Sequence, residues 1–342
     1  MLNNRSVRKK NSQSGKKKNA SPVAPWKKCL KTLQLSLIYL LALYGAHDLA
    51  GKFSSSYKEF AQDKLHLIVE KISGGAKSVE EKFSPLPAVT VKSEKDLRLT
   101  AYDNLTLGVP SYNCDIIIDR PGFALGYSER YEQALWVSYK LTSDEVKSKK
   151  ARRAESFRSD PLIPGKSASV DDYKNTAYDR GHLAPAADMS FSLQAMSESF
   201  LMSNISPQYP ELNRGTWKKL EEKVRDYAVA NGALYIVSGP VFDLSTPNIT
   251  VGKNKVAVPD KYFKVLLDPN SSSPKAIGFV VNNSPREADR SLADIAVSVD
   301  AVEAMTGLDF FNQLDPADEQ KLERSCDFQL WERSLPRAKR SR

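Results

Sequence analysis

Apolar residues along the chain follow two periodicities, which together predict an α+β domain. Runs or alternations of strand length predict β-strands at 114–118, 135–141, 233–238, 263–268 and 277–282. Apolar residues at helical spacing predict α-helices over 191–202, 215–230 and 290–305. The strands cluster without a regular βαβ alternation, and no G-x-G-x-x-G or Walker A pattern occurs, so a doubly wound nucleotide-binding fold is not expected.

The first hundred residues follow a different pattern. Residues 1–31 are rich in Lys, Ser and Asn and have no apolar periodicity, which predicts a disordered basic tail. Residues 32–49 contain a charge-free apolar run, which predicts a signal anchor or transmembrane segment, with a cleaved secretory signal or an organellar leader as alternatives. Residues 50–97 are mixed and polar and are interpreted as a stalk, so the folded domain is assigned to 98–335.

Composition and charge narrow the class of protein. With 41% hydrophobic and 27% charged residues the chain is globular, and three Cys and three His exclude a disulfide-rich scaffold and a four-cysteine zinc site. The net charge of +9 is concentrated at one end, because residues 1–47 carry ten Lys and Arg and no Asp or Glu, leaving −1 for the other 295 residues. A polyanion bound by the domain must therefore be held by local positive charge.

Candidate chemistry begins at Asp179-Arg180-Gly181-His182, the stretch around the central histidine. An imidazole with a pKa near 6.5 can take a proton from water, and a guanidinium can hold a phosphate, so Arg180 and His182 together suit phosphoryl chemistry. Gly181 is expected to allow a tight turn between them. The alternative is a buried structural histidine beside an Asp179–Arg180 ion pair.

A second candidate site lies at the start of the predicted helix 215–230. Projected onto the helix, Asn213 falls within its apolar stripe and Glu221 at the edge of the stripe, on the same side. An inward amide oxygen with a carboxylate near it suits a hard-cation site, in which Asn binds directly and Glu orients a bound water. The alternative is a plain helix N-cap at Asn213 with Glu221 on a solvated face.

These segments resemble the DNA/RNA non-specific endonucleases, the ββα-metal nucleases that include endonuclease G. The resemblance rests on D-R-G-H-L-A-P-A-A at 179–187, S-N-I-S-P-Q at 203–208 and L-N-R-G-x-W-x-x-L-E at 212–221. It continues through V-S-G-P-V-F at 237–242, V-P-x-x-Y-F-K-V at 258–265 and V-E-x-x-T-G-L-D-F-F at 302–311. It covers about residues 105–312 and implies a His-Me finger fold, with a central, mostly antiparallel sheet flanked by helices.

The resemblance implies a mechanism. His182 is the expected general base that deprotonates the attacking water, and Asn213 the expected direct protein ligand of Mg²⁺, for which Mn²⁺ could substitute. Glu221 matches the carboxylate that acts through a metal-bound water. The expected products are 5′-phosphate and 3′-hydroxyl ends from both DNA and RNA, because this chemistry touches neither a base nor a 2′-hydroxyl.

Further polar positions follow from the same resemblance. Arg180 belongs to the central motif, and Asn204 and Arg225 match polar positions that line the site. An upstream arginine is expected to clamp the transition state. Three arginines lie in the matching region, and the local alignment does not choose among them: Arg152, Arg153 and Arg158.

Location and partners are expected as follows. An anchor over 32–49 preceded by lysines places the domain on the non-cytoplasmic side, in a bacterial periplasm or outside the cell, with the mitochondrial intermembrane space or secretion as alternatives. The expected partners are DNA and RNA, a membrane through the N-terminal segment, and a second copy in a homodimer. Cys114 and Cys326 could pair in an oxidising compartment. The alternative function is a membrane-anchored nucleic-acid-binding module without catalysis.

Overall fold

The computed structural model describes residues 89–91 and 102–337, apart from 166, 246–247 and 270–272. The predictions for residues 1–31 and 32–49, and most of those for 50–97, lie outside the described residues. Within the described ranges, no helix is long and apolar enough to cross a membrane.

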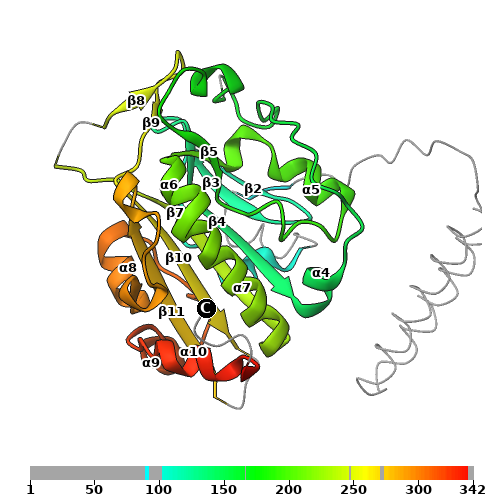
Figure 1. The fold of residues 1–342 in the computed structure, drawn as a ribbon, viewed down its shortest axis with the longest axis vertical. Helices are drawn as coiled ribbons and strands as arrows, with labels where there is room; N and C mark the ends of the chain where they lie inside the picture. The colour runs from blue at the N-terminus through cyan, green and yellow to red at the C-terminus, as the bar shows by residue number, and fades with distance from the viewer. Residues whose placement is uncertain (1–88, 92–101, 166, 246–247, 270–272, 338–342) are drawn as a thin grey trace, which may run out of the picture. The chain divides into compact units, whose positions relative to one another are not determined.

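An eight-stranded sheet forms the centre of the folded unit, and every pair of neighbouring strands in it is antiparallel. Its strands, in spatial order, are β1 (Val89–Val91), β2 (Ile116–Asp119), β3 (Ala124–Ser128), β4 (Gln133–Thr142), β7 (Ala233–Val241), β10 (Lys261–Asp268), β11 (Lys275–Asn282) and β12 (Ala296–Val297) (Figure 1). The antiparallel sheet with flanking helices confirms the predicted α+β class.

The five predicted strands all lie in this sheet, and three of its strands were not expected: β1, β3 and the short β12, which lies within the segment predicted as the helix 290–305. Val89–Val91 pairs with β2, so the prediction of a stalk up to residue 97 is wrong at this point. The segment is only three residues long and its strand conformation depends on pairing with β2, so the sequence pattern did not predict it. The segment Ala124–Ser128 was also not predicted, because its small residues and its glycine are uncommon in strands.

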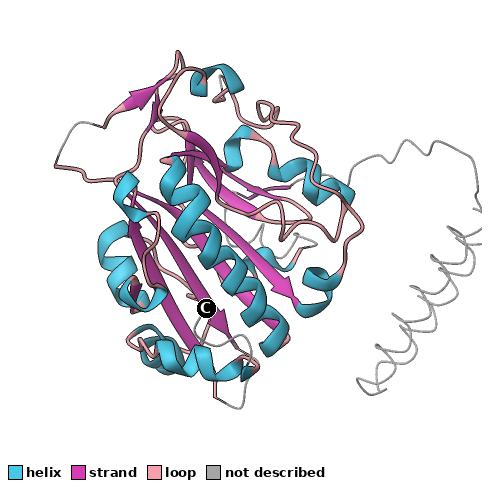
Figure 2. Cartoon of the chain, in the orientation of Figure 1, coloured by secondary structure: helices cyan, strands magenta, loops and turns pink. Residues whose placement is uncertain are grey.

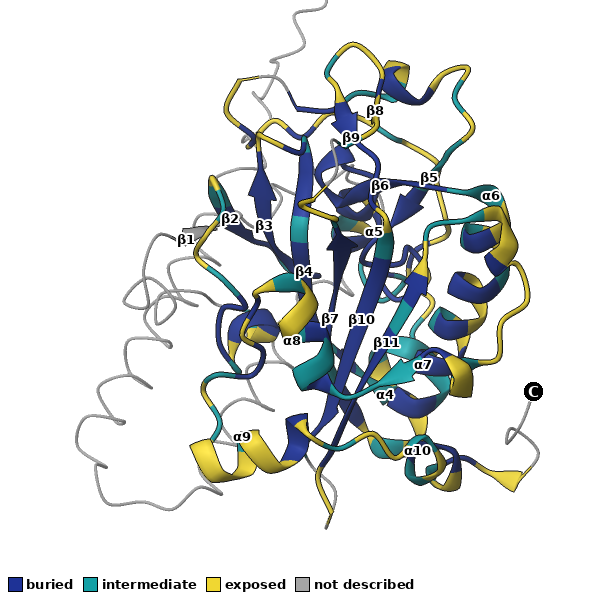
Figure 3. Ribbon diagram, turned by 90° about the vertical axis from the view of Figure 1, so that its left-hand side faces the viewer, coloured by how far each residue is buried: buried dark blue, intermediate teal, exposed yellow. Residues whose placement is uncertain are grey.

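Different helices cover the two faces of the sheet, as Figures 2 and 3 show. One face is covered by α7 (Lys218–Asn231), α4 (Ser143–Lys147) and α10 (Phe328–Ser334). The other is covered by α8 (Val299–Thr306) and α9 (Pro316–Glu323). We call these the α7 face and the α8–α9 face.

Side chains along β10 alternate between the two cores, as the pleat of a strand requires. Tyr262 and Leu266 belong to the core under α7, whereas Phe263 and Val265 belong to the core under α8 and α9. Lys264 has the same parity as Tyr262 and Leu266, so it points toward α7, and it is fully buried. A charged side chain therefore lies inside the core on the α7 face.

A ββα unit lies beside the α7 face and carries the central motif. β5 (Asp179–His182) and β6 (Ile205–Gln208) form a separate antiparallel pair, and the chain then runs through α6 (Pro210–Leu212) and a π-helical turn, Asn213–Trp217, into α7. This order matches the fold class that the resemblance implies. A further small pair, β8 (Thr250–Val251) and β9 (Val256–Ala257), lies outside the main sheet.

The predicted helices are each shorter in the structure. The segment 191–202 contains α5 (Leu193–Ser199) and then a 3₁₀ turn. The segment 290–305 becomes regular only at Val299, because the Ser298 side chain accepts a hydrogen bond from the backbone N–H of Ala301 and caps the helix there.

The start of the long helix is set by a close backbone approach. Gly215 has non-helical dihedrals, φ −103° and ψ −111°, so regular α-helix begins at Lys218 rather than at 215. A Cβ on Gly215 would lie 2.1 Å from the carbonyl oxygen of Ala288, so only glycine fits.

Candidate active site

The β5–β6 pair holds the central histidine at the end of a strand. His182 pairs with Ile205 and Gly181 with Ser206, so the predicted turn at Gly181 is wrong: the residue is in extended backbone. Glycine is needed there for space, because a Cβ would lie 2.0 Å from Oε1 of Gln208. The strand therefore fixes the direction of the imidazole.

His182 is only 8% exposed and packs against the rings of Phe157 and Phe200, with centroid distances of 5.5 and 5.0 Å, and these two rings also contact each other. Burial, together with the positive charges of Arg153 and Arg180, lowers the pKa of His182 to about 3. Its Nε2 atom is buried, and no described residue forms a hydrogen bond with it. At neutral pH the imidazole is therefore uncharged, with a ring nitrogen left for a water or a substrate group.

Asn213 is oriented by a carboxylate of the central motif. Its Nδ2 atom donates to Oδ2 of Asp179 at 2.9 Å, and Arg214 holds the same carboxylate through two bonds of 2.8 and 2.7 Å. Because the amide nitrogen faces Asp179, the Oδ1 atom of Asn213 faces away and can accept another ligand. Its backbone is helical and its side chain makes no cap bond, which contradicts the N-cap alternative.

These residues fit a Mg²⁺ ion. The donor at Asn213 is a hard amide oxygen that no proton competes for, and Mg²⁺ commonly takes one or two protein ligands and completes its shell with water and phosphate. Within the described residues, the one group of three metal-competent carboxylates lies elsewhere, so this site is no all-protein cage of the kind that binds Ca²⁺. An open shell is what a phosphodiester substrate would need.

A layer of buried charges lies under the site on the α7 face. The Arg225 guanidinium bonds to Oδ1 of Asp188 at 2.8 Å, and the Tyr139 hydroxyl donates to Oδ2 of the same carboxylate at 2.9 Å. Asp188 is fully buried and completely paired. The role of Arg225 that the structure shows directly is thus to hold Asp188.

Glu221 and Lys264 belong to the same layer. The pKa of Glu221 is raised to about 7, mainly by burial and in part by Asp188, whereas Lys264 and Arg225 oppose the rise. Burial lowers the pKa of Lys264 to about 8. No described residue forms a hydrogen bond with its Nζ atom, which lies 4.8 Å from the centroid of the Trp217 ring. Lys264 is therefore an electrostatic partner of Glu221 rather than part of a hydrogen-bonded pair.

The geometry separates the three upstream arginines. Arg158 donates to the backbone oxygen and the hydroxyl of Ser197, at 2.8 and 3.1 Å, and is thereby tied to α5. Arg153 lies 5.3 Å from the centroid of the Phe200 ring and is one of the two cations that lower the pKa of His182. Of the three, Arg153 is the one that reaches the histidine.

Arg153 also lines two cavities. One, of 680 Å³, is lined by Arg153, Phe157, Arg180 and Asn213 among others. The other, of 730 Å³, is lined by Arg152, Arg153 and Arg225 among others. Arg152 thus does not line the cavity that contains Arg180 and Asn213.

Asn204 lies behind the site rather than in it. Its side chain is fully buried, exchanges hydrogen bonds of 2.9 Å with the backbone of Ala184 in both directions, and donates to the carbonyl of Ser199. The prediction that Asn204 lines the site is therefore corrected. Its amide forms these backbone hydrogen bonds and thereby holds the loop that follows His182.

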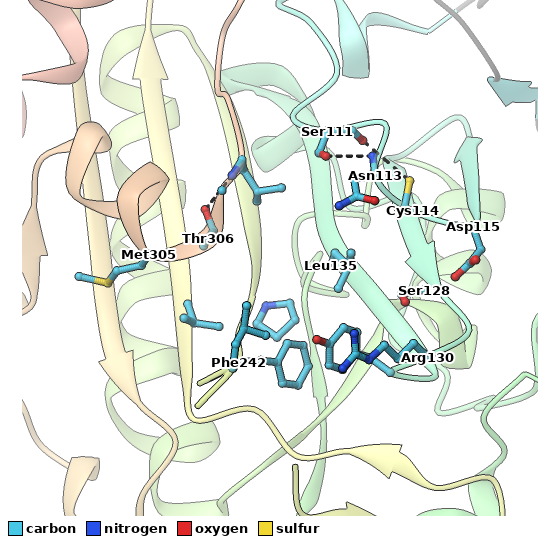
Figure 4. A pocket seen from close by; sticks show the side chains of 16 residues that line it. Ser111, Asn113, Cys114, Asp115, Ser128, Arg130, Leu135, Phe242, Met305 and Thr306 are labelled. Carbon is cyan, nitrogen blue, oxygen red and sulfur yellow. Dashed lines mark hydrogen bonds between the residues drawn. The ribbon is translucent and has the colours of Figure 1, made fainter. Parts of the chain in front are cut away.

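The cavity in Figure 4, of 480 Å³, contains none of the predicted site residues. One wall is formed by Phe242 stacked on Tyr131, and another by Cys114, whose thiol donates weakly to the carbonyl of Ser111 at 3.8 Å. Burial raises the pKa of Cys114 to about 11, so it is an unreactive thiol. Cys114 and Cys326 are both free, so the predicted pair does not form.

Three residues of the site were given no role in it from the sequence. Asp179 begins the central motif, where it was considered only as an ion-pair partner of Arg180, and Asp188 directly follows the motif, but the partners of both are distant in sequence. Lys264 stands in an otherwise apolar strand, and its parity with Tyr262 and Leu266 was a usable signal for a lysine facing α7.

Comparisons with known proteins agree with this geometry. The family model for DNA/RNA non-specific endonucleases matches residues 101–317. Mitochondrial nuclease EXOG of Xenopus laevis is 38% identical over 205 residues, covering 56% of this chain and 57% of that protein, so the chain spans little more than half of this relative. Human mitochondrial endonuclease G is 32% identical over 201 residues, covering 56% of this chain and 68% of that protein.

A solved structure supports the same assignment. The crystal structure of the EndoG/EndoGI complex aligns with a TM-score of 0.58 and 26% identity, over 62% of this chain and 91% of that chain. Fold, motif order and sequence similarity thus point to one group of proteins. The chain belongs to the DNA/RNA non-specific endonuclease family.

Proposed function

We propose that this protein is a Mg²⁺-dependent endonuclease that hydrolyses phosphodiester bonds of DNA and RNA without sequence specificity. The observation that carries the proposal is the uncharged, buried His182, whose Nε2 atom has no bond to any described residue and which shares the ββα unit with the oriented amide of Asn213. A base that is neutral at every physiological pH can act on water without first losing a proton.

His182 takes the proton of the attacking water at the nitrogen that the protein leaves free. Asn213 holds the Mg²⁺ ion through its Oδ1 atom, with Asp179 keeping the amide in orientation. When bound, the ion supplies Lewis-acid stabilisation of the charge on the phosphate and on the leaving 3′-oxygen. Glu221 lies on the first turn of α7 and accepts hydrogen bonds from water on the inner side of the site.

Arginines supply the remaining positive charge. Arg180 lies with its Cζ atom 4.2 Å from the centroid of the Phe157 ring, which braces the guanidinium at the edge of the cavity. Arg153, which lines the same cavity, is the proposed transition-state clamp. Cleavage on the 3′-oxygen side leaves 5′-phosphate and 3′-hydroxyl ends.

Lack of sequence specificity follows from the kind of contact available. The cavity lined by Arg180 and Asn213 also contains Arg153, Lys174 and Arg214, cationic side chains that can hold the phosphate backbone, and phosphate contacts carry no sequence information. Such contacts are shared by DNA and RNA, and they weaken as salt concentration rises.

A gel zymogram tests the proposal. The protein is assayed in gels that contain DNA or RNA, with Mg²⁺ or with chelator, beside a His182→Ala variant. Clearing of both nucleic acids that requires metal and His182 supports the proposal. Absence of clearing, together with a retarded nucleic-acid band in a mobility-shift gel, would instead indicate a binding module.

For the N-terminal segment we propose a targeting role, as anchor or organellar leader, that carries the nuclease domain out of the cytoplasm. The support is the lysine-flanked apolar run at 32–49 and the mitochondrial names of the Xenopus, mouse and human relatives, which favour the mitochondrial alternative. Fractionation of native cells, with nuclease assayed in each fraction, tests this. Activity confined to the cytosol would contradict it.

A further inference from the structure

Three carboxylates converge on the α8–α9 face, away from the proposed catalytic site. Asp300 and Glu303 project from α8 and Glu323 from the last turn of α9. One oxygen of each lies within 4.8 Å of the oxygens of the other two. Figure 3 shows α8 and α9 to one side of the central strands and α7 to the other.

One oxygen of the deepest of the three carboxylates lacks a hydrogen-bond partner among the described residues. Glu323 is only 6% exposed, and its Oε1 atom is buried without a hydrogen bond to any described residue. A buried carboxylate oxygen without a partner is unfavourable, so the arrangement requires a cation or a proton that the described side chains do not supply.

The surrounding charges do not compensate for this carboxylate. Besides Glu303 and Asp300, the carboxylates of Glu319 and Asp309 add negative charge around Glu323. The ion pair that reaches the cluster joins Arg324 Nε to Asp300 at 4.0 Å, and both side chains of that pair are largely exposed. Glu323 itself thus faces acidic neighbours.

We propose that Asp300, Glu303 and Glu323 bind a Ca²⁺ ion that joins α8 to α9. Carboxylate oxygens are the preferred ligands of Ca²⁺, which binds them at about 2.3–2.6 Å, so two oxygens on opposite sides of one ion lie roughly 5 Å apart. Oxygens already within 4.8 Å of one another can therefore share the ion with little movement. Mg²⁺ demands near-octahedral geometry and dehydrates reluctantly, so we expect it to bind a cluster of protein carboxylates less well than Ca²⁺ does.

The ion would stabilise the turn that follows α8. The other role of Glu303 is to accept a hydrogen bond from the backbone N–H of Phe310 at 2.8 Å, across the left-handed Gly307. Phe310 and Phe311 are buried in the core of this face. A cation on Glu303 thus connects α9, the turn and the core, a structural role that does not depend on the proposed catalytic one.

The test measures the Ca²⁺-dependent rise in the melting temperature of the full chain. At a free Ca²⁺ concentration of a hundred times Kd, we expect a rise of about 5 °C, and a smaller rise with Mg²⁺. Glu323→Gln and, separately, Asp300→Asn should each remove most of the Ca²⁺-dependent rise. Asp318→Asn, an exposed acid on α9 outside the cluster, is the matched control and should keep the full rise.

A second variant separates this site from the catalytic one. Asn213→Ala should keep the Ca²⁺-dependent rise, since it alters only the proposed catalytic metal ligand. If the rise is lost in Asn213→Ala and kept in Glu323→Gln and Asp300→Asn, the ion binds at the catalytic site and the proposal is wrong. No rise in the wild-type protein would also overturn it, and would mean that the carboxylates share a proton.

Discussion

The two faces of the sheet bury carboxylates in opposite surroundings. On the α7 face, Asp188 is bonded to Arg225 and Tyr139, and Glu221 lies near Lys264. On the α8–α9 face, Glu323 lies near acidic groups. Burial is the largest cause of a raised carboxyl pKa on both faces, to about 7 for Glu221 and about 8 for Glu323.

The sign of the neighbouring charges makes the difference. Near Glu221, the cations Lys264 and Arg225 oppose the effect of burial, so part of the Glu221 population is ionised at neutral pH beneath the proposed metal site. Near Glu323, the neighbouring carboxylates add to the effect of burial, so charge compensation must come from outside the described protein. The sign of the neighbouring charges thus suits Glu221 to its proposed role beside a metal and Glu323 to an ion or a proton.

The largest expected effect is on the rate of cleavage at the proposed catalytic site. His182→Ala should lower the rate of DNA cleavage by at least about 10²-fold, because a general base typically contributes 10²–10⁴-fold. Steady-state cleavage of a DNA substrate at saturating Mg²⁺ measures it. Circular dichroism and the Mg²⁺ titration should match wild type, and turnover near the wild-type rate would show that His182 is a structural histidine.

Removing the proposed metal ligand should have the next largest effect. Asn213→Ala should raise the Mg²⁺ concentration for half-maximal activity about tenfold or more, because the direct protein ligand is gone. Asp179→Asn should shift it less, since an amide at that position can still accept the Asn213 hydrogen bond. Asp318→Asn on the other face serves as the unshifted control. A wild-type Mg²⁺ titration for Asn213→Ala would remove Asn213 from the metal site.

The buried charge layer can be tested by a double-mutant cycle. At pH 7.5, Lys264→Met should lower the free energy of unfolding by about 2 kcal/mol, because Glu221 and Asp188 lose a buried cation. Adding Glu221→Gln should recover about 1 kcal/mol of that loss. Urea unfolding measures all four proteins.

Two controls accompany this cycle. Lys261→Met changes a lysine of the same strand whose side chain has the opposite parity, and should have little effect. At pH 5.5, below the pKa of Glu221, the carboxyl is protonated and the effect of Lys264→Met should shrink. Strictly additive losses at pH 7.5 would show that Lys264 and Glu221 do not interact.

The smallest expected effect is on the pH dependence of stability, to which Glu323 on the α8–α9 face contributes. Because the pKa of Glu323 is raised from 4.5 to about 8, the folded state holds a proton that the unfolded state releases, so stability falls as pH rises from about 4.5 to 8. In chelator, Glu323→Gln should flatten this slope by a few tenths of a kcal/mol per pH unit. The reduction is modest because Asp300 and Glu303 are only partly buried and solvent relieves part of the repulsion. Thermal unfolding from pH 5 to 8 measures the slope. Identical slopes for the wild-type protein and Glu323→Gln would show that Glu323 is not the group whose pKa is shifted.

Local pattern was enough to predict much of the fold. Five strands of the sheet could be predicted because helices cover both of its faces. A strand buried on both faces is apolar along most of its length, and such a run can be recognised in the sequence alone. The helix 215–230 was predicted for a similar reason, although its first turn depends on contact between Gly215 and Ala288. The strand at Val89–Val91 could not be predicted, because pairing with β2 defines it.

The sequence by itself determined the chemistry available to this protein: one histidine beside an arginine, an asparagine and a glutamate at helical spacing, and the ordered motifs of the family. Tertiary structure alone decided which arginine reaches His182, and that Asn204 supports the loop from behind. It also brought Lys264 under Glu221 and Glu323 against Asp300. The physical reason is that motif spacing reports neighbours within one element, whereas burial and charge at a site are set by strands and helices that meet from distant parts of the chain.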